Sequence, residues 1–325
     1  MKQFVRRQVL RFAALAPALI LSRQAFAETY PTRPIKFVVP FPAGGTTDIL
    51  ARILGQYLSE RLGQQVVVEN KPGGGTNIAV QSVVKSPPDG YTLLMTLATN
   101  TINPWLYKSL PFDYQRDIVA VSGLAELPLV LVVNKDLPAK NVAEFIAYAK
   151  ANPGKVTFAS FGARTISHLS IELIKDSTGI QVLHVPYPGG APMLTDMISG
   201  RIQAGIDALP NSLPHIRAGQ VRCLGVLSKA RSHTMPDVPT IGETIKGFEV
   251  SPWTGVGAPA GTPADIVTRL NRDINASFAN PELIKRYAEI GAVPLVFTPE
   301  EAKAKIVSDT EKWGKVVQRA GLKPE

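Results

Sequence analysis

The chain reads FVVPFPAGGTTDIL over residues 37–50. The β-favouring run Phe37–Val39 enters a loop rich in glycine and threonine, and the apolar spacing after Asp48 is typical of an amphipathic helix. The first backbone N–H groups of such a helix have no partner within it, so they can bind an anion. This stretch therefore predicts an α/β fold with an anion site at the start of its first long helix.

Two further stretches repeat this pattern. The run Val66–Val68 leads into NKPGGGTN at residues 70–77, and Val156–Ala159 leads into SFGART at residues 160–165. Helix patterns follow both loops. Three such sites in one chain predict the capture of a small anion, with a carboxylate favoured, rather than chemistry on it.

Strand and helix patterns alternate along the chain, which predicts parallel sheets with right-handed crossovers. The expected strands are 35–39, 65–69, 91–97, 127–134, 156–159, 181–185, 202–207 and 221–227. The expected helices are 48–62, 77–85, 142–151, 167–178, 191–200, 210–219, 263–278, 281–290 and 299–320, and residues 236–263 read as an irregular segment rich in proline and glycine. We expect two lobes, each with a mainly parallel sheet, because loops that end strands in both series could then face one cleft. Their predicted bounds are 28–125 with 228–325 for lobe 1, and 126–227 for lobe 2.

Residues 1–27 are typical of a secretory signal peptide, with a basic start, an apolar run over 12–21 and the cleavage box Ala25-Phe26-Ala27. Arg6-Arg7 leaves both the general secretory route and twin-arginine export open. The apolar run is too short to span a bilayer. We therefore expect a soluble periplasmic protein. Cys223 is the single cysteine, so no disulfide can form within the chain.

Charge and motifs exclude several function classes. Removal of the five basic residues of the signal lowers the net charge from +9 to +4, which is too weak to favour nucleic-acid binding. The four histidines stand in no HExxH or CxxC context, so we expect no metal site. No GxGxxG follows the first strand and no GxSxG is present, which argues against a dehydrogenase or a serine hydrolase. We expect neither an enzyme nor a cofactor.

Short motifs in a fixed order carry a family resemblance. They are PTRPI (31–35), VPFPAGG (39–45) with Asp48, Ala51 and Arg52, VENKPG (68–73), DGYTL (89–93), Ser167-His168, HVPY (184–187), PHI (214–216), DVPT (237–240) and APAGTP (258–263). In this order they resemble the Bug-type, TctC-like substrate-binding proteins of tripartite tricarboxylate transporters. The resemblance spans essentially the whole mature chain.

The resemblance implies a two-lobed periplasmic binding protein of type II, which closes on its ligand like a Venus flytrap. It implies a carboxylated solute as ligand, a large and a small transmembrane permease subunit as partners, and no cofactor. We expect a monomer. A ligand sensor that presents its closed form to a membrane histidine kinase would have the same fold and pocket, so it remains the alternative; a periplasmic enzyme is a remote one.

The candidate ligand-binding residues of the first loop are Phe41, Ala43, Gly44, Gly45, Thr46 and Asp48. Either the helix N–H groups hold a carboxylate with help from a threonine hydroxyl, or the loop is an ordinary turn in which glycine supplies a positive φ and threonine caps the helix. Asp48 is itself an anion and therefore a poor carboxylate contact. It either favours the helix dipole or braces the loop. Phe41 could pack on an apolar ligand body, as could Trp253, which is equally well suited to the core.

The second loop contributes Gly75, Thr76 and Asn77 as candidates, and Thr99 follows the third strand. The loop is not a Walker motif, because no Gly-Lys-Ser/Thr follows the glycines. The family usually has glycine at the position of Thr76 and near Ala79, where this chain departs from it. Thr76 and Asn77 therefore either contact the ligand or cap the helix.

The third loop contributes Ser160, Arg164, Thr165 and His168. The family usually has small residues around Arg164. An arginine facing the cleft would bind a second carboxylate in bidentate fashion, whereas the alternative is a solvated side chain. This leads to the hypothesis of a dicarboxylate ligand, which could be aromatic like terephthalate, with one end on each lobe; a citrate-like acid is the other candidate. For His168 the structural interpretation is favoured.

Residues near two later strand ends complete the candidate site: Tyr187, Gly190, Ala191 and Asp207. Gly190 and Ala191 start another helix, and Tyr187 would form a side wall of the cleft. Asp207 ends a strand, where it either accepts a hydrogen bond from the ligand or pins the lobe.

Overall fold

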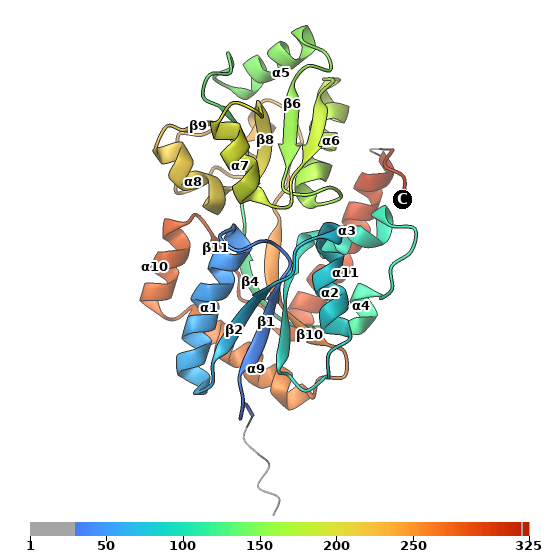
Figure 1. Ribbon diagram of the computed structural model, residues 1–325, viewed down its shortest axis with the longest axis vertical. Helices are drawn as coiled ribbons and strands as arrows, with labels where there is room; N and C mark the ends of the chain where they lie inside the picture. The colour runs from blue at the N-terminus through green and yellow to red at the C-terminus, as the bar shows by residue number, and fades with distance from the viewer. Residues whose placement is uncertain (1–29, 320, 325) are drawn as a thin grey trace, which may run out of the picture.

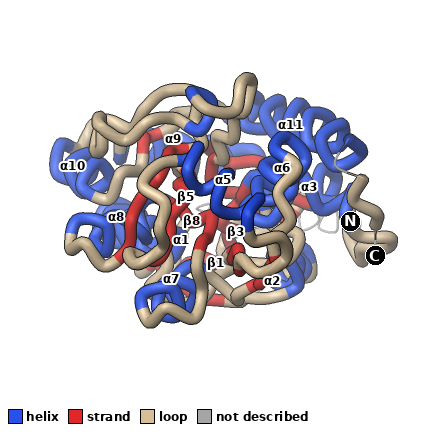
Figure 2. The backbone as a smooth tube through the Cα atoms, turned by 90° about the horizontal axis from the view of Figure 1, so that it is seen from above, coloured by secondary structure: helices blue, strands red, loops and turns tan. Residues whose placement is uncertain are grey.

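The computed structural model describes residues 30–319 and 321–324, and within them the chain forms two lobes, one above the other in Figure 1. The expected signal peptide, residues 1–27, lies outside the described residues. Each lobe is built on one sheet, and helices surround the strands in the view of Figure 2. Within the described ranges, none of the helices is long and apolar enough to cross a bilayer.

Lobe 1, the lower lobe in Figure 1, holds a six-stranded sheet in the order β11-β4-β10-β3-β1-β2. Its strands are β1 (Ile35–Val39), β2 (Val66–Asn70), β3 (Thr92–Leu97), β4 (Ile118–Glu126), β10 (Trp253–Pro259) and β11 (Val293–Pro294). Its helices are α1 (Thr46–Leu62), α2 (Asn77–Val84), α3 (Ala98–Leu106), α4 (Tyr114–Asp117), α9 (Ala264–Ser277), α10 (Pro281–Glu289) and α11 (Pro299–Arg319), and a short 3-10 turn, η1, covers Gly74–Thr76.

Lobe 2, the upper lobe, holds a five-stranded sheet in the order β7-β6-β8-β5-β9. Its strands are β5 (Leu129–Asn134), β6 (Thr157–Ser160), β7 (Leu183–Pro186), β8 (Ala204–Ala208) and β9 (Val221–Val226). Its helices are α5 (Val142–Ala151), α6 (Ile166–Thr178), α7 (Gly190–Ile198) and α8 (Leu209–Arg217), followed by a 3-10 turn, η2 (Ile241–Glu243).

Both sheets are mixed, for one shared reason. The strands of the βα units pair in parallel, as the sequence predicts: β1 pairs with β2 and β3, and β6 pairs with β7 and β8. The strands β10 and β5 pair antiparallel with both of their neighbours. The fold is therefore the expected two-lobed α/β arrangement, with one reversed interior strand in each sheet and a second reversed strand, β11, at the edge of the lobe 1 sheet.

The second crossing between the lobes comes later than the predicted boundary at residues 227/228. Thr240 forms a parallel bridge with Val226, and the Val250 N–H donates to the Leu227 carbonyl. Ile241 and Val250 are buried in the cluster that also contains Phe158 of lobe 2. Residues 228–250 therefore pack on lobe 2, and the chain returns to lobe 1 just before β10.

The sequence reading missed β10, which lies between β3 and β4. Its glycines and its proline are typical of loops. In the folded chain, a Cβ at Gly255 would lie 2.5 Å from the Ser122 carbonyl oxygen, and one at Gly257 would lie 2.8 Å from side-chain carbons of Ile118 and Thr96. The glycines are therefore required by close neighbouring strands rather than by a turn.

Candidate functional site

A cavity lies between the two lobes, at the end where five helices begin. Its walls include the first residues of α1 and α3 from lobe 1 and of α6 and α7 from lobe 2. From α8 they include Ala208, the residue just before the helix. Each of these helices has at least nine residues. Several positive helix ends thus point toward one space, which favours an anion there.

The start of α1 is the best-defined part of this wall. Its N-cap, Gly45, has no side chain to cap the helix, so the first-turn N–H groups lack the usual acceptor. Thr46, the first helical residue, lines the cavity and is 7% exposed. Its Oγ1 is buried and has no hydrogen-bond partner among the described residues. An unmet hydroxyl beside unmet N–H groups is the arrangement that a carboxylate would complete.

Asp48 braces this loop from behind. Its Oδ2 accepts hydrogen bonds from the Gly44 N–H (3.0 Å) and the Arg52 Nε (2.9 Å), and its Oδ1 accepts one from Asn70 Nδ2 (3.0 Å). Burial opposes ionisation of Asp48, but these hydrogen bonds outweigh it and hold its pKa below the usual range. Gly44, held by Asp48, has a φ of 82°, a conformation that glycine adopts readily. Of the two roles considered for Asp48, the geometry favours the brace.

The GGGTN loop faces α3 rather than the cavity. Asn103 Nδ2 donates to the Gly75 carbonyl (2.9 Å) and to Asn77 Oδ1 (2.6 Å), and Asn100 Nδ2 donates to Thr76 Oγ1 (2.8 Å). None of these loop residues lines the cavity. The asparagines of α3 therefore supply partners for Gly75, Thr76 and Asn77 Oδ1, whereas Asn77 Nδ2 is buried with no partner among the described residues.

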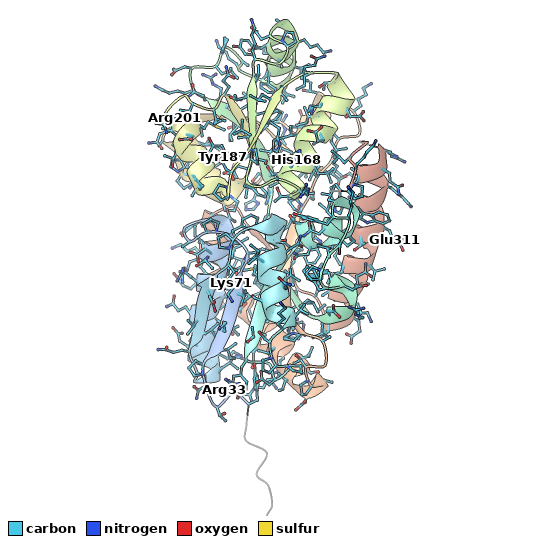
Figure 3. The ribbon with its side chains drawn as sticks, turned by 45° about the vertical axis from the view of Figure 1, so that its right-hand side comes forward. Arg33, Lys71, His168, Tyr187, Arg201 and Glu311 are labelled. Atoms are coloured by element: carbon cyan, nitrogen blue, oxygen red, sulfur yellow. The ribbon has the colours of Figure 1, made fainter. Side chains whose placement is uncertain are left out.

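Polar groups of the third loop are used mainly within lobe 2. Ser160 Oγ lies 2.7 Å from His184 Nε2 and donates to the Gly162 carbonyl (3.0 Å). Thr165 Oγ1 donates to the same carbonyl (2.8 Å). The rings of His168 and His184 stack with their centroids 3.9 Å apart. Ser160 and His168 thus belong to one structural network, and Figure 3 shows His168 at the lower edge of lobe 2.

This network sets the charge of two groups. Burial lowers the pKa of His184 to about 4. Burial would raise the pKa of Glu172, but hydrogen bonds from His168 and Lys175 lower it to about 2. At neutral pH, therefore, His184 is neutral and Glu172 is ionised.

Arg164 lies where the two lobes meet, but it does not line the cavity. Its φ is 60°, and its guanidinium lies over the ring of Tyr107 from lobe 1, 4.9 Å from the centroid. Its N–H donates to His168 Nδ1 (3.1 Å). Nearby, the Ile166 N–H at the start of α6 donates to Thr99 Oγ1 of α3 (3.3 Å). These contacts join the lobes beside the cavity.

Aromatic rings close another side of the cavity. Phe41 of lobe 1 meets Phe161 of lobe 2 edge to face, with centroids 5.7 Å apart, and both line the cavity. Trp253 also lines it, and its Nε1 donates to Asp309 Oδ2 (2.6 Å). Trp253 is therefore both a wall of the cavity and anchored in the core. Tyr187 turns away instead, since its hydroxyl donates to Asp196 Oδ2 (2.7 Å).

The structure brings part of the predicted site together. The predicted residues that line the cavity are Phe41, Gly45, Thr46, Thr99, Gly190, Ala191 and Asp207. Those that lie outside its lining are Ala43, Gly44, Asp48, Gly75, Thr76, Asn77, Ser160, Arg164, Thr165, His168 and Tyr187. Thr47 and Gly189, which also line the cavity, belong to two helix starts that the sequence singled out. The lining residues that sequence reasoning missed are Pro42, Leu97, Ala98, Leu127, Leu129, Phe161, Ile166, Pro192, Ala208, Asn211 and Pro252. Most of these are apolar, and no motif distinguishes them from core residues.

Within residues 30–319 and 321–324, no three His, Cys, Asp or Glu side chains gather as metal ligands would. Among the residues that the structure describes, none that lines the cavity is a lysine, arginine or histidine. An anion in this cavity would therefore be held by backbone and side-chain dipoles rather than by a counter-charge.

The chain is similar to one set of proteins along nearly its whole length. The family model of the tripartite tricarboxylate transporter family receptor matches residues 50–322. BugT of Bordetella pertussis (strain Tohama I) is 39% identical over 300 residues, which cover 91% of this chain and 92% of that protein. A structure of R. palustris Rpa4515 with adipate is 38% identical, with a TM-score of 0.89, and covers 91% of this chain and 100% of that chain. MatC from Rhodopseudomonas palustris with bound malate is 29% identical, with a TM-score of 0.82, and covers 89% of this chain and 100% of that chain.

Proposed function

The chain belongs to the tripartite tricarboxylate transporter receptor family, and we propose that it captures a small carboxylate between its lobes, with one carboxylate group at the start of α1. Membership confirms the resemblance that the ordered motifs indicated. It also makes the chain a carboxylate-binding receptor of periplasmic type and not an enzyme. The residues that hold the ligand, the ligand itself and the membrane partners are the parts we propose.

The single observation that carries the proposal is the unmet polar surface at the start of α1. Thr46 Oγ1 is buried in the cavity wall without a partner, beside a helix end that has no side-chain cap. A buried polar atom without a partner is costly, so such atoms are rare in folded proteins. A carboxylate accepts from hydroxyl and N–H donors alike, and it would satisfy Thr46 and the helix end together.

The cavity also limits the body of the ligand. Its walls are mainly aliphatic and aromatic, with Phe41, Phe161 and Trp253 from three separate segments. Such walls suit a carbon chain or ring between two polar ends. Since relatives of known structure hold adipate or malate, we propose a dicarboxylate, aliphatic or aromatic.

The role of Arg164 remains a prediction from the sequence. Its guanidinium lies on the Tyr107 ring at the junction of the lobes and outside the cavity lining. This placement favours a contact that holds the lobes closed over one that binds the second carboxylate directly. We further propose that the loaded receptor delivers its solute to a large and a small transmembrane permease subunit, as family membership suggests.

A thermal-shift screen of residues 28–325 tests the proposal. The probes are adipate, malate, citrate and terephthalate, and the control is adipamide, which keeps the carbon chain of adipate but carries no charge. Because a ligand that binds only the native state stabilises it by about 2.7 kcal/mol at a hundred times its Kd, at least one acid should raise the melting temperature and adipamide should not. A shift with adipamide equal to that of adipate, or no shift with any acid, would overturn the proposal.

A further inference from the structure

Asp207 is the one ionisable side chain among the described residues that line the cavity. It lies at the end of β8, just before α8, and is 1% exposed. A carboxylate buried in the wall of a carboxylate-binding cavity is unexpected, because two like charges in a poorly solvated space repel each other.

The geometry of Asp207 places both of its side-chain donors on one oxygen. Both hydrogen bonds from side chains go to Oδ2, from Asn211 Nδ2 (2.7 Å) and Ser212 Oγ (2.6 Å). The other oxygen, Oδ1, lies against the first residue of α7, Gly190, where any Cβ would collide with it. Glycine at this position thus lets the start of α7, which also lines the cavity, approach Oδ1 closely.

The charged side chains around Asp207 offer little to hold it ionised. His215, on α8, is the side chain whose field lowers the pKa of Asp207, and it is half-buried. The acid of α7, Asp196, is paired with Tyr187 and Arg201. On β7, His184 is bonded to Ser160, and on α1 Asp48 is paired with Arg52. Burial outweighs the hydrogen bonds from Ser212, Asn211 and the Ala208 backbone N–H, and it raises the pKa of Asp207 to about 6.

We propose that Asp207 is a neutral carboxylic acid in the loaded receptor, so that capture of the ligand takes up one proton from water and the new Asp207 O–H donates to the second carboxylate of the ligand. The proton binds Asp207 as the ligand enters, and it returns to water when the ligand leaves. The ligand keeps both of its charges, and no covalent bond to it forms or breaks. This inference rests on the proposed function and assigns the second end of a dicarboxylate to lobe 2.

Two consequences follow for binding. A second anion in the cavity raises the pKa of Asp207 further, so that at neutral pH the empty receptor is mostly ionised and the loaded receptor is protonated. Affinity for a dicarboxylate should then weaken with rising pH, by up to about tenfold per pH unit above the pKa of the empty form. A monocarboxylate of the same length lacks the second acceptor and should bind more weakly.

Isothermal titration calorimetry with adipate tests this inference directly. At about pH 7, in bis-Tris and in Tris, the measured enthalpies should differ by the difference in buffer ionisation enthalpy multiplied by close to one proton taken up per ligand. The Asp207→Asn variant keeps a donor but cannot titrate, so it should bind adipate with no buffer dependence. The Asp176→Asn variant, which changes an exposed acid of the same lobe, should behave as wild type.

The outcomes separate the two proposals. Adipate binding by wild type with equal enthalpies in the two buffers would overturn the proton uptake, and this measurement does not depend on any variant folding. Uptake that persists in a folded Asp207→Asn variant would assign the proton to another group. If adipate gives no heat, the titration is repeated with malate, citrate and terephthalate, and no heat with any of them would overturn the carboxylate receptor itself.

Discussion

Thr46→Val removes one hydroxyl group and keeps the branched shape of the side chain. In the ligand-free protein this hydroxyl is buried without a hydrogen-bond partner. A buried polar group left unmet costs about 1–3 kcal/mol. The ligand-free variant should therefore be as stable as wild type, or more stable by up to that amount.

Ligand binding by the same variant should move in the opposite direction. A hydrogen bond to a charged group contributes about 1.5–3 kcal/mol, and the proposal places one between Thr46 Oγ1 and the ionised carboxylate. Its loss corresponds to a Kd raised roughly 10- to 150-fold. Calorimetric titration with the acid that gives the largest thermal shift measures this change, and urea unfolding without ligand measures the stability.

Thr310→Val is the matched control. Thr310 is also a buried threonine, but it lies on α11, and its Oγ1 donates to the Ile306 carbonyl (2.8 Å). This variant should lose about 1 kcal/mol of stability, the usual net contribution of such a bond, and keep its affinity. Unchanged affinity in Thr46→Val, or a loss of stability like that of Thr310→Val, would refute the role given to Thr46.

Three further changes follow from the charges and contacts of lobe 2. The pKa of Asp207 is raised from 3.8 to about 6, so the stability that this raised pKa contributes is full below pH 3.8 and is lost as pH rises through 6. Between pH 4 and pH 7, Asp207→Asn should therefore gain up to about 3 kcal/mol of stability relative to wild type. Thermal melts in which the difference between the two proteins stays constant with pH would contradict this prediction. Arg164→Ala removes the contact with the Tyr107 ring and should weaken adipate and its monoacid analogue hexanoate by the same factor; a loss confined to adipate would place Arg164 on the second carboxylate instead. The pKa of His184 is lowered from 6.5 to about 4, so the stability that neutral His184 contributes is lost as pH falls from 6.5 to 4. His184→Asn should therefore lose less stability on acidification than wild type. Melting curves with the same acid dependence for both proteins would refute this prediction.

Much of the fold could be predicted because its βα units are local. The strand Ile35–Val39 and the helix Val142–Ala151 were predicted with the observed bounds, since apolar periodicity and flanking glycine or proline are signals within a few residues. The strand β10 was missed because Gly255 and Gly257 are explained only by neighbours from distant segments. The helix α3 was missed because Pro104 lies inside it and its polar residues resemble a loop.

The site was predictable only at its helix starts. The loop at Gly45–Thr46 carries its signal within a few residues, and it lines the cavity. The apolar walls carry no such local signal. In sequence, Phe161 looks like a core residue, and it differs from one only because the other lobe faces it across the cleft. In the GGGTN loop, by contrast, Thr76 Oγ1 and the Gly75 carbonyl are bonded to Asn100 and Asn103 of α3, so the structural alternative is favoured for these groups. A sequence shows which polar groups need partners but not which distant side chains supply them.

A crystal structure of residues 28–325 with the acid that gives the largest thermal shift tests the central claim most directly. The account predicts a carboxylate oxygen within about 2.7–3.2 Å of the Thr46 hydroxyl and of an N–H at the start of α1. A carboxylate bound elsewhere, such as in the second cavity lined by Lys229, Arg231 and His233, with the start of α1 still unmet, would contradict it.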